Sequence, residues 1–446
     1  MPNALSLTDG ATTISLSSSG CLLTHYVPDG PEMQANGEYK PITETVEFTI
    51  IETTTALVRT KLNSIERLLT GVNNRLMNRT GPRVYLAFQA TGDAAASRSE
   101  LTNYRLSLEP DAAVAFAQGI LGVRLIVTRV PFWEGARTSI ALTNGNGTNV
   151  TSGLTIKAHD DATVGDDNWC NIAGSSIAGS LPSPLEIRMV NNSGASREYH
   201  NFFVANNTVG QALAHIIEGE SMVSGYGTAY ADAACSNGNY TRRTGAGWLT
   251  FRWVIPAASL ALFRGRYVRV LARFRTLSSA DRDIRLTLHD DAGLTILARS
   301  PQTVAKNGAA DIQDCGALAL PSAGYATNWA TVVLEVAVFT PASETVEIDF
   351  IQLTPAEPMQ YRRITQVAGY LHPVDDAVVD DGIEGLVYFE TTATGLRELD
   401  YIARNEPVCV WPGVDQRLLI LHDGAASLPA WSLSVQAWYR PRRTLF

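Results

Sequence analysis

The sequence predicts a mainly β protein with several antiparallel β-sandwich domains and one long amphipathic helix in the N-terminal domain. In most segments apolar and polar residues alternate with a period of two, which is typical of strands with one buried and one wet face. Clusters of Asn, Asp and Gly recur between these segments and indicate tight turns. The 446 residues, of which 45% are hydrophobic, are enough for about three domains of roughly 150 residues each.

The N-terminal part begins with short strands, and one of them leads into a helix. Strands are predicted around 12–16, 21–26 and 45–51. Between Thr53 and Met77, six apolar residues recur at spacings of four and three, which places them on one stripe of a helix. They are Val58, Leu62, Ile65, Leu69, Val72 and Leu76. We expect this stripe to make core or oligomer contacts, on a sheet or on another subunit.

Three more strands, around 84–89, 104–109 and 123–130, precede the run Arg129–Gly135 (RVPFWEG). This order of elements resembles the N-terminal belt domain of the distal tail proteins of siphophages. The resemblance covers residues 1–134, about 30% of the chain, and the run Arg129–Gly135 is its most specific part. It implies a small β-barrel with a helix, whose copies join in a ring at the tail tip.

A second resemblance lies in the middle of the chain. Residues 215–220 (HIIEGE), 231–240 (ADAACSNGNY) and 347–353 (EIDFIQL) resemble motifs of jelly-roll carbohydrate-binding modules. In that family, acids of the first strand and an aspartate of the last strand hold a structural calcium ion, which would clip the two strands together. Carried over, the metal ligands are Glu218, Glu220 and Asp349, although Gly219 stands where the family has alanine. The alternative is three solvated acids at strand ends.

Sugar binding needs flat aromatic rings beside hydrogen-bonding groups. The candidates near the loops of this module are Tyr240, Trp248 and Trp329. For each of them a place in the core is the alternative. Several arginines share the polar side of two predicted strands. This stripe is either a solvated sheet face or a surface that attracts acidic glycans or an acidic partner. They are Arg269, Arg273, Arg275 and Arg285.

Three domains follow from these segments. Residues 1–134 form the belt-like domain, and 213–357 form the jelly-roll module. The segment 135–212 is too short for a comfortable sandwich alone, so we expect it to join 358–446 in one galectin-like β-sandwich, into which the jelly roll is inserted. A galectin-like sandwich also follows the belt in distal tail proteins.

Several functions find no support in the sequence. The net charge of −9 argues against a protein that coats nucleic acid. The five cysteines are far apart and form no zinc or redox motif. No secretory signal and no membrane-spanning run is recognisable, so we expect assembly in the bacterial cytoplasm. No motif of a common hydrolase, nucleotide-binding site or zinc protease occurs, and pairs such as His289–Asp290 read as turns after strands.

The sequence therefore predicts a structural, non-enzymatic phage tail-tip protein, a distal tail or minor tail component of the virion baseplate. The resemblance implies a homo-oligomeric ring, a hexamer by expectation, in contact with tail tube and tail-tip hub proteins. The jelly roll would serve host attachment by binding cell-surface glycans, with a structural Ca²⁺ as its one cofactor and with neither nucleic acid nor membrane as a partner. The alternatives are a polysaccharide-degrading enzyme, whose paired carboxylates no spacing would reveal, and a surface adhesin with a carbohydrate-binding module.

Overall fold

The computed structural model describes residues 4–32, 39–78, 81–108, 117–143, 149–150, 154–157, 168–208, 216–233, 235–255, 265–276, 281–301, 303–305, 311–320, 331–398, 401–422 and 432–444. The predicted fold class is confirmed, because these residues form many antiparallel strands and a single α-helix. The chain divides into two compact units. The first contains residues 1–138, 178–181 and 440–446, and the second contains residues 139–177 and 182–439.

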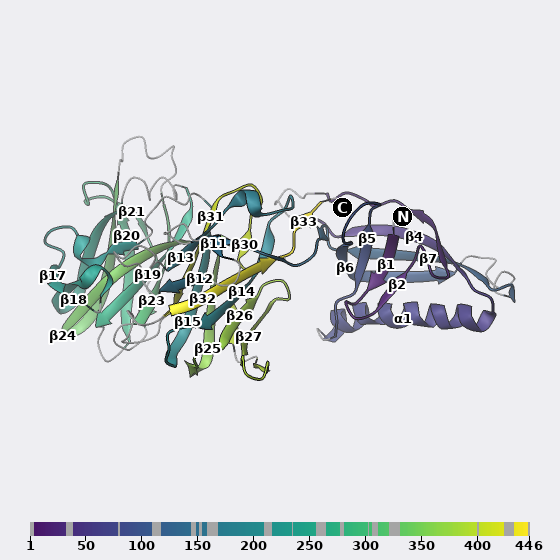
Figure 1. Ribbon diagram of the computed structural model, residues 1–446. Coiled ribbons are helices and arrows are strands. Elements are labelled where there is room, and N and C mark those ends of the chain that lie inside the picture. The colour runs from purple at the N-terminus through teal and green to yellow at the C-terminus, as the bar shows by residue number, and fades with distance from the viewer. Residues whose placement is uncertain are drawn as a thin grey trace. The chain divides into compact units, whose positions relative to one another are not determined.

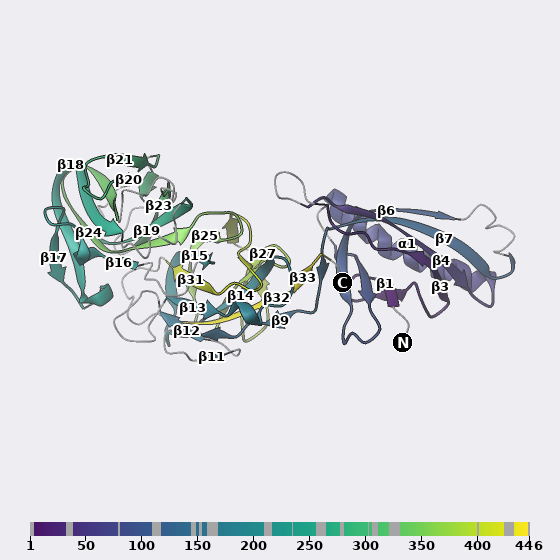
Figure 2. The same ribbon diagram turned by 90° about the horizontal axis from the view of Figure 1, so that it is seen from above.

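The first unit is one antiparallel sheet with a helix along one face (Figures 1 and 2). The strand order is β2-β1-β5-β6-β7-β4-β3, and β8 pairs with both β6 and β33. The strands are β1 (Ala4–Thr8), β2 (Thr13–Ser15), β3 (Cys21–Tyr26), β4 (Ile42–Ile51), β5 (Tyr85–Gln89), β6 (Ser97–Leu108), β7 (Ile120–Arg129), β8 (Trp133–Glu134) and β33 (Arg442–Arg443). The end of the chain, which the sequence analysis placed with the sandwich, thus belongs to the first unit.

The helix α1 (Thr55–Asn78) begins and packs much as its sequence predicts. The Thr54 hydroxyl accepts a hydrogen bond from the Leu57 N–H at 3.3 Å, which caps the first turn. Four of the six stripe residues are buried in the core of the unit: Val58, Ile65, Leu69 and Val72. Leu62 is partly buried against the same core. Leu76 is 65% exposed, so the last turn of the helix extends beyond the buried stripe.

The second unit contains a β-sandwich made from two separate stretches of sequence. One sheet has the order β11-β10-β13-β31-β15-β25-β29, and the other has β12-β32-β14-β26-β27-β28, with β30 beside β14 and β9 beside β32. In both sheets, strands from before residue 208 therefore pair with strands from after residue 360. The strands are β9 (Thr138–Ser139), β10 (Leu142–Thr143), β11 (Asn149–Val150), β12 (Leu154–Lys157), β13 (Trp169–Ile172), β14 (Ser183–Asn191), β15 (Arg197–Asn207), β25 (Tyr361–His372), β26 (Ala377–Asp381), β27 (Leu386–Glu390), β28 (Arg397–Glu398), β29 (Tyr401–Arg404), β30 (Cys409–Val410), β31 (Gln416–His422) and β32 (Ser432–Tyr439).

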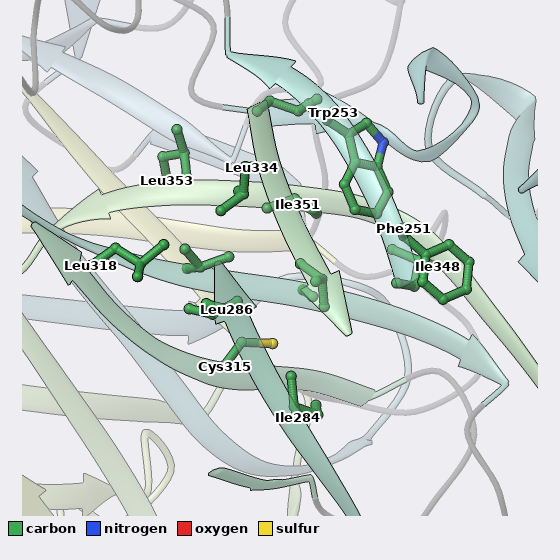
Figure 3. Close-up of a cluster of buried hydrophobic side chains, with 14 of the residues drawn as sticks. Phe251, Trp253, Ile284, Leu286, Cys315, Leu318, Leu334, Ile348, Ile351 and Leu353 are labelled. Carbon is green, nitrogen blue, oxygen red and sulfur yellow. The ribbon is translucent and has the colours of Figure 1, made fainter. Parts of the chain in front are cut away.

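Residues 216–355 form the other part of this unit, around the long strands β18 and β24. These two strands pair over most of their length, with one register shift at Gly245–Gly247. β20 pairs with the first half of β24, and β19 pairs with its second half. The strands are β16 (Ile216–Glu218), β17 (Thr228–Ala231), β18 (Asn239–Ile255), β19 (Tyr267–Thr276), β20 (Arg282–His289), β21 (Ile296–Arg299), β22 (Thr303–Ala305), β23 (Asp311–Ala319) and β24 (Val332–Pro355). Their inward side chains, Phe251 and Trp253 among them, form the core shown in Figure 3.

This second part of the unit replaces the loop of a hairpin in the sandwich. β15 and β25 are antiparallel neighbours, and Ala205 lies opposite Tyr361, so the chain leaves and re-enters the sandwich at adjacent points. Leu271 and Phe350 pack against the sandwich residues Phe203 and Tyr361 in one buried cluster. The inserted part is therefore held on the sandwich by hydrophobic contacts as well as by the two chain segments that connect them. No helix among the described residues has the length and apolar character needed to cross a lipid bilayer.

Candidate functional site

The three predicted metal ligands lie around one turn, the short 3-10 helix Ser236–Gly238. The carboxylate of Glu218 accepts a hydrogen bond from the Ser236 hydroxyl at 3.0 Å, and that of Glu220 accepts one from the Asn237 amide at 3.0 Å. Asp349 accepts the backbone N–H of Ser236 at 2.9 Å. The turn therefore joins the first strand of the inserted part to its last, as a calcium clip would.

Asp349 is fully buried, and its second oxygen forms an ion pair with the buried Arg273. Burial raises the pKa of Asp349 to about 6, and this effect outweighs the opposing influence of Arg273. The guanidinium thus already supplies a cation beside this carboxylate. Within the described ranges, no group of three or more His, Cys, Asp or Glu residues is placed to hold a metal ion.

Gly219, the departure from the family pattern, has a structural reason. A Cβ atom there would lie 2.3 Å from the carbonyl oxygen of Ile348 and 2.5 Å from that of Asp349. The Gly219 carbonyl also accepts a hydrogen bond from the Trp253 indole at 3.2 Å. The backbone of the first strand therefore approaches the last strand too closely for any side chain.

Tyr240 is only 5% exposed and forms the inner layer of a stack. Its ring lies 5.7 Å from that of Tyr230, which is 40% exposed. Arg242 donates a hydrogen bond to the Tyr240 hydroxyl at 2.7 Å, and Arg275 lies 4.7 Å from its ring centre. Tyr230 is thus the exposed ring of this pair, and the Arg242 guanidinium lies 4.3 Å from its centre. Trp329 lies outside the described residues.

Trp248 belongs to a different surface, the outward side of β18, β24 and β20. Its ring lies 5.4 Å from that of Phe339 and 4.4 Å from the Arg285 guanidinium. The strand register places further residues on the same side. We call this surface the β20 face, and define it by Trp248, Arg252, Asp283, Arg285, Thr287, His289, Glu335, Ala337 and Phe339.

The middle of the β20 face is polar and nearly shielded from water. Glu335 is 5% exposed, and it pairs with Arg252 at 2.8 Å and lies 3.3 Å from His289 Nε2. Burial lowers the pKa of His289, although Glu335 opposes this shift. The hydroxyl of the buried Thr287 and Nδ1 of His289 have no hydrogen-bond partner. These two atoms are shielded from water, because Thr287 is 0% and His289 is 4% exposed, so the accessible groups of the β20 face are its aromatic and charged side chains.

The predicted arginine stripe divides between two environments. Arg269 pairs with Asp314 at 2.7 Å, Arg273 pairs with Asp349, and Arg275 bonds to Glu347 at 2.7 Å. Arg285 alone of the four lies on the β20 face, away from these pairs. No motif marks Glu335 or His289 as a site residue, although the alternation of apolar and polar residues along both strands places them on the polar side.

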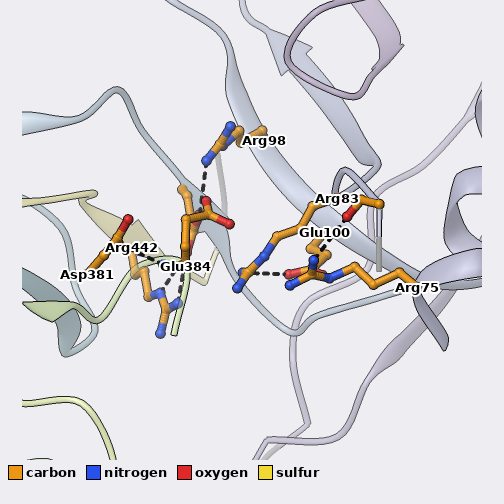
Figure 4. Close-up of polar contacts among 9 residues, drawn as sticks. Arg75, Arg83, Arg98, Glu100, Asp381, Glu384 and Arg442 are labelled. Atoms are coloured by element: carbon orange, nitrogen blue, oxygen red, sulfur yellow. Dashed lines mark hydrogen bonds and ion pairs between the residues drawn. The ribbon is translucent and has the colours of Figure 1, made fainter. Parts of the chain in front are cut away.

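The segment Arg129–Gly135 has a defined role in the first unit. Arg129 is fully buried, bonds to Glu44 at 2.6 Å and 3.0 Å, and lies 4.7 Å from the ring of Trp133. Glu134 accepts two hydrogen bonds from Arg442, at 2.8 Å and 3.0 Å. The Gly135 N–H donates to the Pro441 carbonyl at 2.8 Å. This run therefore joins the C-terminal segment around Arg442 to the sheet of the first unit. Figure 4 shows Arg98 and Arg442 in this region.

A scan against protein-family models finds no match, and neither does a search of the curated proteins. Among solved structures, the chain is similar to a chain of the phage P2 baseplate in its activated conformation with Ca. That match has 8% identity and a TM-score of 0.32, and it covers 100% of both chains. The chain is also similar to the SPP1 Dit protein, with 8% identity, a TM-score of 0.31 and 99% coverage of each chain.

A third solved structure matches part of the chain. It is the tandem of two CBM22 domains from the N-terminus of Paenibacillus barcinonensis Xyn10C, with 9% identity and a TM-score of 0.22. The match covers 55% of this chain and 98% of that structure.

Proposed function

We propose that this chain is a structural protein of a phage tail tip, whose first unit builds a ring of copies and whose inserted jelly roll binds host glycans. The observation that carries the proposal is the junction at Arg129–Gly135. The run most specific to the belt resemblance is also built into the first unit, through the buried Arg129–Glu44 pair and the Glu134–Arg442 pair.

The arrangement of the second unit supports the same function. A module seated in place of a hairpin loop can vary without disturbing the sheets that carry it. The jelly roll is therefore the part suited to recognition, and the sandwich is the part suited to support. A ring would present several copies of the module at once, so that weak binding by each copy becomes strong attachment.

The first unit offers surfaces for contacts between copies and with tube and hub proteins. β3 is an edge strand of the sheet, and such an edge usually needs a cover or a partner. The apolar side chains of Leu22 and Ile51, on β3 and the adjacent β4, are about half exposed. A closed ring, a hexamer by the resemblance, would bury such edges through heterologous contacts.

The direct test is to locate the chain in virions. Negative-stain images of particles labelled with an antibody to this chain should show the label at the tail tip, and absence of the chain from virions would exclude the proposal. Native mass spectrometry of the full chain tests the ring separately. A species that remains monomeric both alone and with its tail neighbours would exclude ring formation.

The calcium clip is a separate part of the proposal. Glu218, Glu220 and Asp349 would be the ligands, and a bound ion would stabilise the folded jelly roll. Thermal unfolding of the full chain, with excess Ca²⁺ and with a chelator, measures this. An unchanged unfolding profile would mean that the ion pair of Asp349 with Arg273 serves as the clip instead.

The expectation that the chain is not an enzyme is tested by incubating it with capsular and cell-wall polysaccharides. An increase in reducing ends that scales with protein concentration would favour the polysaccharide-degrading alternative. A monomer that binds glycans but is absent from virions would favour the adhesin.

A further inference from the structure

We propose that the β20 face binds an acidic saccharide, whose carboxylate pairs with Arg285 while a sugar ring packs on Trp248. This inference deepens the proposed function and rests on its claim that the jelly roll binds glycans. It names the chemical class of the glycan and the residue that selects for it.

Arg285 has no carboxylate partner among the described residues. Six other arginines of the jelly roll form ion pairs with carboxylates: Arg242, Arg252, Arg269, Arg273, Arg275 and Arg282. Arg285 is half-buried, forms no ion pair with any described residue, and its Nε has no hydrogen-bond partner. A partly desolvated guanidinium gains most from a carboxylate, because its planar fork donates two parallel hydrogen bonds.

The surface around Arg285 carries more positive than negative side chains. Arg299 lies opposite Thr287 in the register of β21 and β20, which places it on the same side of the sheet. Three arginines, 252, 285 and 299, thus face two carboxylates, those of Glu335 and Asp283. Glu335 is already paired with Arg252, and Asp283 forms no ion pair with Arg285. The surface is net positive in a chain whose overall charge is −9, so it would attract an anion.

Aromatic rings lie beside Arg285 on the same face. Trp248 and Phe339 offer adjoining rings, and Phe339 is 38% exposed. Arg285, Thr287 and His289 are alternate residues of one strand, so their side chains follow one another at about 7 Å intervals. Thr287 and His289 are 0% and 4% exposed, so they support this side of the strand and leave Arg285 and the two rings as the groups that a ligand can reach.

The experiment compares saccharides that differ only in charge. The full chain is applied to an array of hexasaccharides in matched pairs, glucuronate against glucose and galacturonate against galactose, in both α and β linkages. We expect the acidic member of at least one pair to bind about tenfold more tightly, the gain typical of a hydrogen bond to a charged group. This preference should weaken as salt is added.

Three variants and one control test which residues cause the preference. Arg285→Gln should abolish most of the preference for the acidic member, and Asp283→Asn should increase it. Arg397→Gln is the matched control, because Arg397 stacks on Tyr388 at 4.5 Å but lies on the sandwich, and it should change nothing. Trp248→Ala should weaken both members of a pair.

The outcomes separate this inference from the function on which it rests. Equal binding of acidic and neutral saccharides would overturn the inference and leave glycan binding intact. A preference that survives in Arg285→Gln would also overturn it. If the folded chain binds no saccharide of the array, the proposed glycan binding fails, and the inference fails with it.

Discussion

The buried pair of Arg129 and Glu44 allows a quantitative test of how the first unit is held together. Both side chains are completely inaccessible to solvent. The Arg129→Met substitution would leave the Glu44 carboxylate buried with two hydrogen-bond donors, the Tyr26 hydroxyl and the Asp29 N–H. Removing one partner of a buried ion pair typically costs about 3–5 kcal/mol. We therefore expect a loss of that size in the local stability of β4 and β7.

Hydrogen exchange of the full chain, followed by mass spectrometry, measures this stability strand by strand. At about 1.4 kcal/mol per factor of ten, the protection of amides in β4 and β7 should fall by roughly two to four orders of magnitude. The exposed pair of Arg124 and Glu47 provides a matched control on the same two strands. Its atoms are 3.5 Å apart and its side chains are 54% and 34% exposed, so Arg124→Met should cost less than about 1 kcal/mol.

A double variant separates the loss of the pair from the burial of an unpaired charge. Replacing Arg129 by Met and Glu44 by Leu together removes both charges, and such apolar replacements are often neutral or stabilising. The double variant should therefore be more stable than Arg129→Met alone. If Arg129→Met costs no more than Arg124→Met, or if the double variant is the least stable of all, the pair does not have the role assigned to it here.

Three further predictions concern stability. Ile65→Ala should lower the free energy of unfolding of the full chain by about 2–5 kcal/mol. Leu76→Ala should change the free energy of unfolding by less than about 0.5 kcal/mol, because Leu76 is exposed. Equal losses for the two variants in denaturant unfolding would contradict the burial of the stripe. Gly219→Ala should lower the unfolding temperature of the jelly roll in calorimetry, since the added methyl would overlap two carbonyl oxygens, and a neutral result would mean that the strands can separate there. Because burial raises the pKa of Asp349 from 3.8 to about 6, the folded state holds this proton more tightly than the unfolded state. The stability of the jelly roll should therefore fall as the pH rises from about 4 to 6, by at most about 3 kcal/mol, and Asp349→Asn should abolish this dependence.

The helix was the most predictable element, because its signal is local. Spacings of four and three place Val58, Ile65 and Leu69 on one side of any helix, and all three are buried. The same spacing includes Leu76, which instead lines a hollow of about 320 Å³ beside Val84 and Leu101. Near this hollow, Glu100 bonds to Arg83 at 3.0 Å and lies 3.6 Å from Arg75 (Figure 4). The sequence determines which residues lie on one side of the helix. The extent of the sheet that covers this side determines which of them are buried.

Neighbours that are distant in sequence were less predictable. The motif resemblance brought Glu218, Glu220 and Asp349 to one end of the module, and the structure places all three around Ser236 and Asn237. Nothing in the local sequence indicated that Arg273 would reach Asp349. That contact depends on the register between β19 and β24, which shifts at Arg273, and a shift of one residue moves a side chain to the other face.

The arginine stripe shows the physical limit of such reasoning. Alternation along β19 correctly separates Val268 and Val270 from Arg269 and Leu271, but it cannot state what covers the second side. Leu271 is completely buried because that side packs on the sandwich, against residues from a segment more than 60 positions away. Arg285 belongs to the same predicted stripe, yet it lies on the β20 face. A period of two therefore assigns residues to faces, and only the fold assigns faces to solvent, to another domain or to a ligand.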